Sequence, residues 1–379
     1  MNDPLMLAVS IDDQRLDLVA DNRVVASYPV STATKGVGFV DGSYRTPVGR
    51  FRVAEKIGHD EISGTVFRGR EPQGMWLPDT ITSEDLILTR ILRLDGLDAA
   101  NANTLDRNIY IHGTNREDLL GTPASHGCIR MRNADVLELF RKVPEGTLVV
   151  IHPPTRKRGK VIFLDCDSTL SGIEGIDELA RARGKVIFEE IVALTNAAMN
   201  GEVPLDEVFG RRMEMIRPTQ SMADRVAIRY LETVTPGMSE LVSGLQARGW
   251  LTVILSGGFL PLIEPLARSL GIEQIEAVPL YFDHDGNYAG YGADYPTTRG
   301  GGKNVIIREW RQAMLPERVV MMGDGVSDLE TKPDVDMFVG FGGVVAREPV
   351  RRGADYWVPE MIAGTQLMDV IDGGTGRST

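Results

Sequence analysis

A change in hydrophobic patterning near residue 154 constrains the fold more than any other feature of the sequence. Before it, apolar and polar residues alternate in short stretches, at 14–20, 23–30, 50–56, 86–94, 108–112 and 147–152. After it, the apolar stretches are continuous, at 161–164, 251–255 and 319–322, with helix-like segments between them. Alternation predicts half-buried strands, whereas continuous apolar strands predict a parallel sheet covered on both faces. The 379 residues therefore predict two domains, one mostly β and one α/β.

The boundary between the two patterns is a short basic segment. Residues 154–160 read Pro-Thr-Arg-Lys-Arg-Gly-Lys, with four basic side chains and no acidic one. A charged stretch that begins with proline and lies between two apolar strands is typical of a linker. We therefore expect a mostly β domain at 1–153, a linker at 154–160 and an α/β domain at 161–379. In the first domain we expect a helix after Arg132, with Asn133 as its N-cap.

Composition narrows the possible partners and compartments. The 53 acidic residues outnumber the 41 basic ones, and a net charge of −12 argues against nucleic-acid binding. No apolar run approaches the roughly 20 residues that a membrane span needs. The first residues lack the basic leader and long apolar run of a secretory signal, so we expect a cytoplasmic protein. Two cysteines, Cys128 and Cys166, are too few for a disulfide framework.

Polar residues follow the strands predicted in the second half. The stretch 161–164 runs into Asp165-Cys166-Asp167, and 251–255 ends at Ser256-Gly257-Gly258. The carboxyl ends of parallel strands lie at one edge of a sheet, where ligands bind. One aspartate could attack phosphorus while the other exchanges a proton with the leaving oxygen. A serine hydroxyl and backbone N–H groups at a helix start could bind the phosphate.

Two further segments supply charge to the same pocket. Lys303 follows three consecutive glycines and offers one cation near a phosphate. The stretch 319–322 ends at Gly323-Asp324, and Asp328 follows four residues later. Together with Asp165, these carboxylates could hold Mg²⁺ through oxygen ligands.

In this order and spacing, these residues resemble the haloacid dehalogenase superfamily, and more closely the phosphoserine phosphatases. The resemblance covers 161–372 and is carried by the stretches 165–169, 174–180, 255–259 and 339–343. It implies a doubly wound parallel sheet with a helical cap at about 177–235. It also implies Mg²⁺-dependent hydrolysis of O-phosphoserine to serine and phosphate through a phospho-aspartate.

The same resemblance implies roles for individual residues. Asp165 would be the nucleophile, Asp167 the general acid and then the base, and Lys303 the cation that neutralises the phospho-aspartate. Substrate would be bound by Glu174, Met199, Arg212, Ser256 and Gly257. The metal site would involve Asp165, Asp167, Asp324 and Asp328.

Two positions depart from the family pattern. Leu205 stands where the family often has an aromatic residue, which leaves strict selectivity for serine open. Ser327 stands where asparagine is usual, which leaves the contact at that position open.

A second cluster lies in the first half. Three of the chain's seven cysteines and histidines, His112, His126 and Cys128, fall within 17 residues. A thiol attacks a carbonyl only as thiolate, so it needs a base such as His112 and cationic surroundings such as Arg130. The N–H groups of Gly127 and Cys128 could form an oxyanion hole. The alternatives are a buried structural cysteine and a zinc site, although His126-x-Cys128 is tighter than usual zinc-ligand spacing.

The sequence Ser125-His126-Gly127-Cys128 after His112 resembles the YkuD-type L,D-transpeptidases, over residues 6 to about 152. The resemblance implies a β-sandwich-like fold and an acyl-cysteine reaction on peptidoglycan stem peptides or their precursors. Cys128 would be the nucleophile, His112 the base and the Gly113 carbonyl its orienting group. Substrate would be bound by Ser125, His126, Gly127 and Arg130.

The two resemblances imply different compartments, because transpeptidases of this kind usually act outside the membrane and phosphoserine is a cytosolic metabolite. We therefore keep an alternative. The first domain would be a non-catalytic muropeptide-binding or regulatory module, and the second would hydrolyse another small phosphomonoester.

Overall fold

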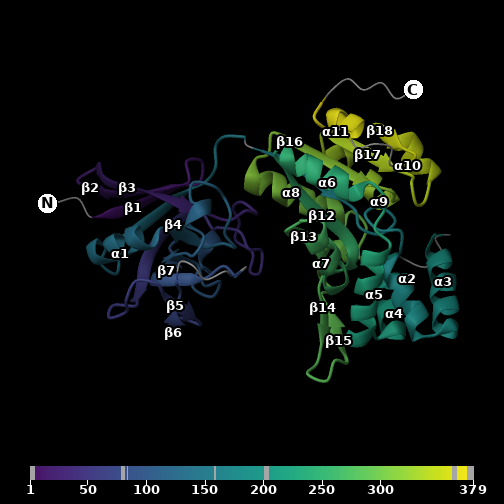
Figure 1. Cartoon of the computed structure of the whole chain (residues 1–379), viewed down its shortest axis with the longest axis horizontal. Coiled ribbons are helices and arrows are strands. Elements are labelled where there is room, and N and C mark those ends of the chain that lie inside the picture. The colour runs from purple at the N-terminus through teal and green to yellow at the C-terminus, as the bar shows by residue number, and fades with distance from the viewer. Residues whose placement is uncertain are drawn as a thin grey trace. The chain divides into compact units, whose positions relative to one another are not determined.

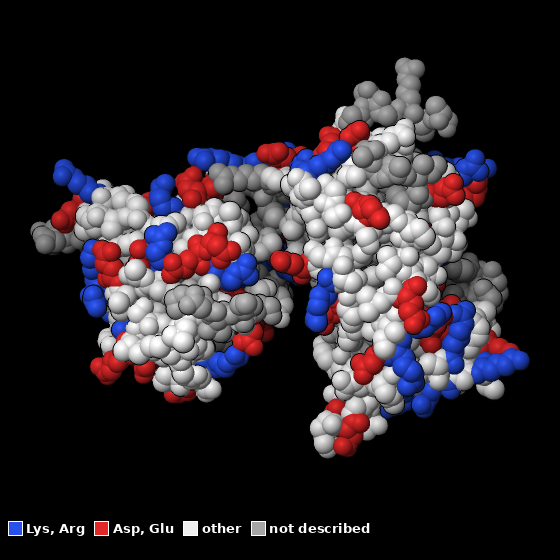
Figure 2. Space-filling view, in the orientation of Figure 1, with Lys and Arg blue, Asp and Glu red and all other residues white. Residues whose placement is uncertain are grey.

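The computed structural model describes residues 5–77, 82, 84–157, 159–199, 205–360 and 365–373, without the side chains of 195–199, 205–207 and 365. The chain divides into two compact units (Figure 1). Residues 1–157 with 310–315 form the first, and 158–309 with 316–379 form the second. In the view of Figure 2, acidic and basic side chains are both present on each unit. Among the described helices, none is long and apolar enough to cross a membrane.

The first unit is built on one ten-stranded sheet in the order β4-β10-β1-β2-β3-β9-β8-β7-β5-β6. Its strands are β1 (Met6–Ser10), β2 (Arg15–Ala20), β3 (Arg23–Ser31), β4 (Gly49–Ile57), β5 (Thr65–Arg68), β6 (Glu71–Met75), β7 (Ile87–Gly96), β8 (Tyr110–Gly113), β9 (Ile129–Met131) and β10 (Leu148–His152). Strand β4 pairs with both β10 and β7, so the sheet closes on itself, and β5 and β6 extend it beside β7.

This closure differs from the expected β-sandwich. Period-two alternation places apolar residues on one face, as with the fully buried Leu7 and Val9 of β1 and Leu16 of β2, but it does not distinguish two stacked sheets from one closed sheet. The deciding contact is the parallel pairing of β1 with β10, strands that lie at opposite ends of the domain sequence. Closing the sheet satisfies backbone groups that a sandwich would leave at its edges.

Helix α1 (Asn133–Lys142) packs its buried Val136, Leu139 and Phe140 into the core of the first unit. The expected cap is one residue off, because Arg132 is the N-cap and Asn133 is the first helical residue. The Asn133 amide is used elsewhere: it donates to the Thr114 carbonyl at 2.8 Å and to Glu117 at 2.9 Å. Asn133 therefore ties the helix start to the segment after β8.

The second unit contains a six-stranded sheet in the order β13-β12-β11-β16-β17-β18, with every neighbouring pair parallel. Its strands are β11 (Lys160–Leu164), β12 (Trp250–Phe259), β13 (Gln274–Val278), β16 (Arg318–Gly323), β17 (Met337–Phe341) and β18 (Tyr356–Val358). The helices among them are α6 (Met238–Ala247), α7 (Leu260–Ser269), α8 (Gly302–Met314), α9 (Val326–Leu329), α10 (Glu348–Gly353) and α11 (Thr365–Ile371). The chain continues to β12 on one side of β11 and later to β16 on the other, so the strand order reverses at β11, where ligand sites of open α/β sheets form.

Four consecutive helices between β11 and α6 lie together in Figure 1. They are α2 (Gly175–Arg183), α3 (Lys185–Met199), α4 (Leu205–Ile216) and α5 (Gln220–Glu232). A hairpin of β14 (Leu280–Phe282) and β15 (Tyr288–Tyr291) lies beside them. Phe209 of α4 packs against Phe259 and Tyr291, with ring centroids 5.7 and 5.4 Å away, so the helices are tied to the sheet end and to the hairpin.

Candidate active sites

The carboxyl ends of β11, β12 and β16 bring the predicted phosphatase residues together. Asp165 follows β11, Asp324 follows β16, and Lys303 lies in the first turn of α8. The Lys303 Nζ donates to Asp165 Oδ1 at 2.7 Å and to Asp328 Oδ1 at 2.5 Å. All four side chains are buried. The site therefore holds three carboxylates around one ammonium at the predicted sheet edge.

Burial and pairing act in opposite directions on these charges. Burial alone would lower the pKa of Lys303, but the carboxylates of Asp165 and Asp328 outweigh it and raise that pKa above its usual value. For Asp328, burial and the neighbouring Asp165 raise the pKa to about 7, and the Lys303 ammonium opposes the rise. The lysine therefore stays charged beside Asp165, where it can neutralise a phosphorylated carboxylate.

Asp167 lies in a different environment. Tyr230 donates a hydrogen bond to its Oδ1, and the Gly175 N–H donates to Oδ2 at 3.1 Å. Burial, followed by the negative charge of Glu174, raises the pKa of Asp167 to about 8, although the Tyr230 bond opposes the rise. At neutral pH this carboxyl group holds its proton, as a general acid must.

The residues present fit a divalent cation. Carboxylate oxygens of Asp165, Asp324 and Asp328 all lie within 4.8 Å of one another. Asp324 Oδ1 accepts from Thr169 at 3.1 Å, while Asp324 Oδ2 is buried and has no hydrogen bond. Its partner is the Arg347 guanidinium, with which it forms an ion pair, and a carboxylate oxygen is a ligand that Mg²⁺ prefers. Both oxygens of Asp328 are already bonded, to Lys303 and to the Gly325 N–H at 2.9 Å, which suits a supporting role.

The part of Asp167 in metal binding stays a prediction. Its two carboxylate oxygens bond to Tyr230 and Gly175, and its side chain is absent from the carboxylate group found among the described residues. The Gly175 N–H belongs to the first residue of α2, which begins eight residues after Asp167.

The predicted phosphate loop is an irregular end of a strand. The pairing of β12 with β13 shifts register between Leu255 and Phe259, and such a bulge redirects the side chains within it. Ser256 is buried there, and its hydroxyl accepts the Gly258 N–H at 2.9 Å. The bulge thus places Ser256 and Gly257 at the same sheet end as Asp165.

The predicted substrate-binding residues come from the helices that follow β11. Glu174 is the N-cap of α2 and accepts from the Ser168 hydroxyl at 2.7 Å. Arg212 has a buried Nε without a hydrogen bond, and its guanidinium lies 5.8 Å from the Phe209 ring. Such a guanidinium has donors available for an anionic group. The side chains of Met199 and Leu205 lie outside the described part of the chain.

The sequence did not single out Tyr230, Phe209 or Arg347. Tyr230 is fully buried on α5 and reaches Asp167 across 63 residues of sequence. Arg347, the N-cap of α10, forms an ion pair with Asp324, and its Nη2 lies 3.9 Å from Glu174. The glycine-rich stretch before Arg347 is a signal that could have directed attention to it.

In the first unit, the parallel pairing of β8 and β9 positions the predicted cysteine site. Ile111 pairs with Ile129 and His112 with Arg130, so Cys128 lies beside Tyr110, at the start of β9. The Tyr110 N–H donates to the Cys128 sulfur at 3.4 Å, and the thiol lies 3.4 Å from the Asn108 carbonyl. His112 is buried, with Nδ1 2.8 Å from the Gly113 carbonyl, which is the orienting contact expected from the sequence.

The resting cysteine site is neutral. Burial raises the pKa of Cys128 to about 11, although the Tyr110 N–H opposes the rise. Burial lowers the pKa of His112, with the Gly113 contact acting against it. Among the hydrogen bonds of the described residues, none joins His112 to Cys128. A thiol and a neutral imidazole are therefore the resting forms at neutral pH.

Two expectations for this site change. The Gly127 N–H donates to the Ser125 hydroxyl at 3.2 Å, so this expected oxyanion donor is already used in the resting arrangement. Gly127 has a φ of +120°, a conformation that favours glycine. The Arg130 guanidinium is buried and ion-paired with Asp85, which also lies 3.4 Å from His126 Nδ1, so its positive charge is compensated.

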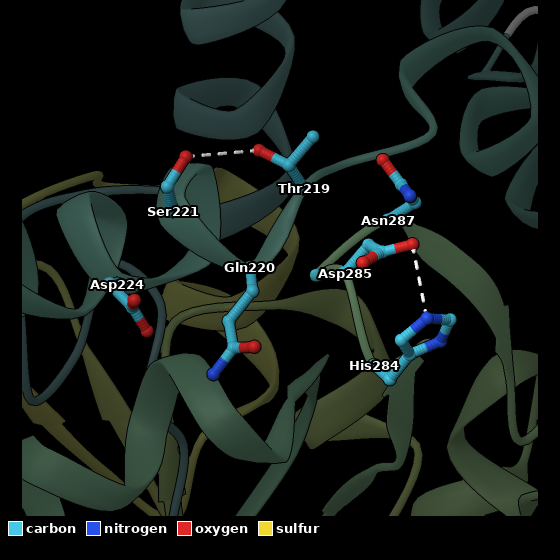
Figure 3. Close-up of a pocket in the computed structure, with 8 residues that line it drawn as sticks. Thr219, Gln220, Ser221, Asp224, His284, Asp285 and Asn287 are labelled. Atoms are coloured by element: carbon cyan, nitrogen blue, oxygen red, sulfur yellow. Dashed lines mark hydrogen bonds and ion pairs between the residues drawn. The ribbon is translucent and has the colours of Figure 1, made fainter.

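A surface pocket of the second unit, drawn in Figure 3, is lined by none of the residues predicted for the phosphatase site. It is lined by the start of α5 and the β14–β15 turn, including Thr219, Asp224 and His284. His284 lies 3.3 Å from Asp285, and the neighbouring Asp283 accepts backbone N–H groups of the turn. The turn itself accounts for these polar groups, so we assign the pocket no function.

Comparisons with known proteins agree with the division of the chain. The YkuD family, the L,D-transpeptidase catalytic domain, matches residues 5–151. The haloacid dehalogenase-like hydrolase family matches residues 162–331.

Relatives match the second unit. A phosphoserine phosphatase of Bos taurus is 35% identical over 203 residues, which are 53% of this chain and 89% of the relative. One of Drosophila melanogaster is 36% identical over 207 residues, 54% of this chain and 76% of the relative. The crystal structure of a haloacid dehalogenase family hydrolase from Salmonella enterica has a TM-score of 0.50 at 21% identity, covering 56% of this chain and 71% of that one, which supports the fold alone. The chain therefore joins a YkuD-type L,D-transpeptidase catalytic domain to a haloacid dehalogenase-like hydrolase domain and belongs to the phosphoserine phosphatase family.

Proposed function

We propose that the second unit hydrolyses O-phosphoserine to serine and phosphate with Mg²⁺ as cofactor. The observation that carries this proposal is the Lys303 ammonium bonded to both Asp165 and Asp328, at the same sheet end as Asp167. Relatives named phosphoserine phosphatase support the choice of substrate. Arg212 and Glu174 are the charged groups that would bind its carboxylate and its ammonium.

The reaction is a double displacement at phosphorus. An Asp165 oxygen attacks the phosphorus, the bond from phosphorus to the serine oxygen breaks, and Asp167 donates its proton to that oxygen. Asp167, now ionised, takes a proton from a water molecule that attacks the phospho-aspartate and releases phosphate. Asp165, Asp324 and Asp328 would hold Mg²⁺, which supplies positive charge opposite the phosphoryl oxygens. Lys303 neutralises the phosphorylated Asp165.

The direct test measures phosphate release from O-phosphoserine, O-phosphothreonine and sugar phosphates, each with Mg²⁺ and with EDTA. We expect turnover of phosphoserine that EDTA abolishes. Turnover of sugar phosphates in preference to phosphoserine would overturn the substrate and favour the alternative of another small phosphomonoester. Equal turnover with Mg²⁺ and with EDTA would overturn the requirement for metal.

For the first unit we propose a cysteine acyl transfer on peptidoglycan stem peptides or precursors, with Cys128 as nucleophile and His112 as base. Two contacts support this proposal. The Gly113 carbonyl holds the His112 imidazole, and the N–H of Tyr110, two positions before His112 on the same strand, contacts the Cys128 sulfur. The thiol must lose its proton as substrate binds, because its resting form is neutral. The proton would pass to His112 and then to the leaving amine.

Acylation of Cys128 distinguishes this proposal from the alternative of a non-catalytic muropeptide-binding or regulatory module. Under reducing conditions, mass spectrometry of the chain incubated with a carbapenem should show an adduct on Cys128 that Cys128→Ser removes. Absence of the adduct, with muropeptide binding still measurable, would favour the module.

A further inference from the structure

Arg347 is a charged residue of the phosphatase site without a role in the reaction described above. It is the N-cap of α10 and follows the glycine-rich segment after β17. Its Nη1 forms an ion pair with Asp324 Oδ2 and lies 3.3 Å from the Asp324 carbonyl oxygen, while Nη2 lies 3.9 Å from Glu174 Oε1. One guanidinium thus faces two carboxylates that come from different elements.

The Asp324 oxygen that Arg347 faces is the one best suited to a metal. Asp324 Oδ1 already accepts from Thr169, whereas Oδ2 is buried without a hydrogen bond. The side chain of Asp324 is 3% exposed and that of Arg347 is 32% exposed, so water screens the carboxylate poorly and the guanidinium keeps a solvent path. A divalent cation on Oδ2 and the guanidinium on the same atom repel each other, and only one can occupy the position.

Charge balance points in the same direction. Lys303 neutralises one of the three clustered carboxylates, Asp165, Asp324 and Asp328. Lys303 bonds to Asp165 and Asp328, so the charge of Asp324 is left to another counter-ion, which either a divalent cation or the Arg347 guanidinium can supply. Buried charge without compensation is costly, so a counter-ion on Asp324 stabilises the site when the metal is absent.

We propose that Arg347 is a positioning residue that competes with the divalent metal for Asp324 and thereby sets the metal affinity of the site. Without metal, the guanidinium compensates Asp324 Oδ2. Metal binding displaces it toward the Glu174 carboxylate, which is already within 3.9 Å of Nη2. This inference rests on the proposed Mg²⁺-dependent function. It adds that displacing the Arg347 side chain lowers the net affinity of the site for the metal.

The test is calorimetric titration of Mg²⁺ into the full chain without substrate, with Mn²⁺ electron paramagnetic resonance as a second readout. Arg347→Met keeps most of the side-chain volume and removes the charge, so we expect Mg²⁺ to bind roughly three- to tenfold more tightly. Arg347→Lys keeps the charge and should stay near the wild-type affinity. Arg352→Met is the matched control, because Arg352 lies on the same helix, is 80% exposed and pairs with Glu348.

A thermal measurement separates competition from a structural fault. In EDTA, Arg347→Met should unfold at a lower temperature than the wild type, and saturating Mg²⁺ should remove the difference. Unchanged or weaker Mg²⁺ binding by a folded Arg347→Met would overturn the inference and leave the proposed function intact. A wild-type chain that binds no divalent cation would overturn both.

Discussion

The two sites of this chain prepare their nucleophiles in opposite ways. In the parallel-sheet unit, Asp165 is bonded to a charged lysine, and a neighbouring carboxyl group already holds the proton that the leaving group needs. In the barrel, Cys128 is a neutral thiol beside a neutral histidine, and the nearby charges of Arg130 and Asp85 are paired with each other. The first site is charged before substrate arrives, whereas the second must create its charge during the reaction.

The difference follows from the number of charges that each fold gathers. Strand ends at a topological switch point bring several carboxylates and a lysine into one buried cluster, where they compensate one another. The barrel presents its cysteine beside the Tyr110 N–H, which stabilises a thiolate less than a cation does. The Asn108 carbonyl accepts from the thiol and so favours its protonated form.

The largest effect should come from Asp165→Asn. An amide cannot form the phospho-aspartate, so phosphate release should fall by at least about 10³-fold while Cys128 alkylation stays unchanged. The phosphatase activity is measured as phosphate release from O-phosphoserine with saturating Mg²⁺. The reactivity of Cys128 is measured by iodoacetamide labelling. Asp355→Asn, which removes an outer ion pair with Lys332, is the control. A labelling rate that changes with Asp165→Asn would contradict the independence of the two chemistries.

The next effect concerns pH. With a pKa of about 11 for Cys128, the thiolate fraction rises tenfold per pH unit, so iodoacetamide labelling should accelerate about 100-fold between pH 7 and pH 9. Cys128→Ser should remove the labelling, since Cys166 is fully buried. A rate that levels off below pH 8 would mean that Cys128 is a preformed thiolate, and the contrast between the sites would collapse.

Arg212→Ala tests recognition at the charged site. Loss of a charge-assisted contact to the substrate carboxylate should raise KM for O-phosphoserine roughly ten- to a hundredfold. KM for phosphoethanolamine, which lacks that carboxylate, should change little. Arg211→Ala provides the matched control, as Arg211 is the exposed neighbour on α4. Equal increases for both substrates would exclude a specific contact between Arg212 and the carboxylate.

The smallest effect should come from Asp85→Asn in the barrel. Asp85 raises the pKa of Cys128 through its negative charge and neutralises Arg130. Removing that charge should lower the pKa of the thiol and speed labelling at pH 8 about three- to tenfold. The exposed ion pair between Asp118 and Arg116 offers a control, Asp118→Asn. Slower labelling of a folded Asp85→Asn chain would show that Asp85 supports the thiolate instead.

Sequence patterning predicted the elements that bear the sites, because each is defined by local periodicity. The stretches at 23–30, 50–56 and 161–164 correspond to strands that differ from them by at most one residue at either end. Closure of the barrel was not predictable from alternation, since it depends on β1 pairing with β10 across the whole domain. The short strands β5, β6 and β9 were also missed, because three to five residues carry too little periodicity.

For the sites, residues within a motif were predictable and their distant partners were not. Asp165, Asp167 and Cys128 lie in short, recognisable sequence motifs. Tyr230 bonds to Asp167 from 63 positions away, and Asp85 pairs with Arg130 from 45 positions away. Neither partner lies in a motif. Such partners are set by tertiary packing, which is why the compensated charge of Arg130 and the protonation of Asp167 required the structure.

The parallel pairing of β1 with β10 also affects how the chain is made. The first strand of the barrel lacks this neighbour until residues Leu148–His152 have been synthesised. Contacts so distant in sequence form slowly, because a long loop must close before they stabilise anything. The barrel therefore completes its folding only after its last strand leaves the ribosome, while the second unit is still being translated.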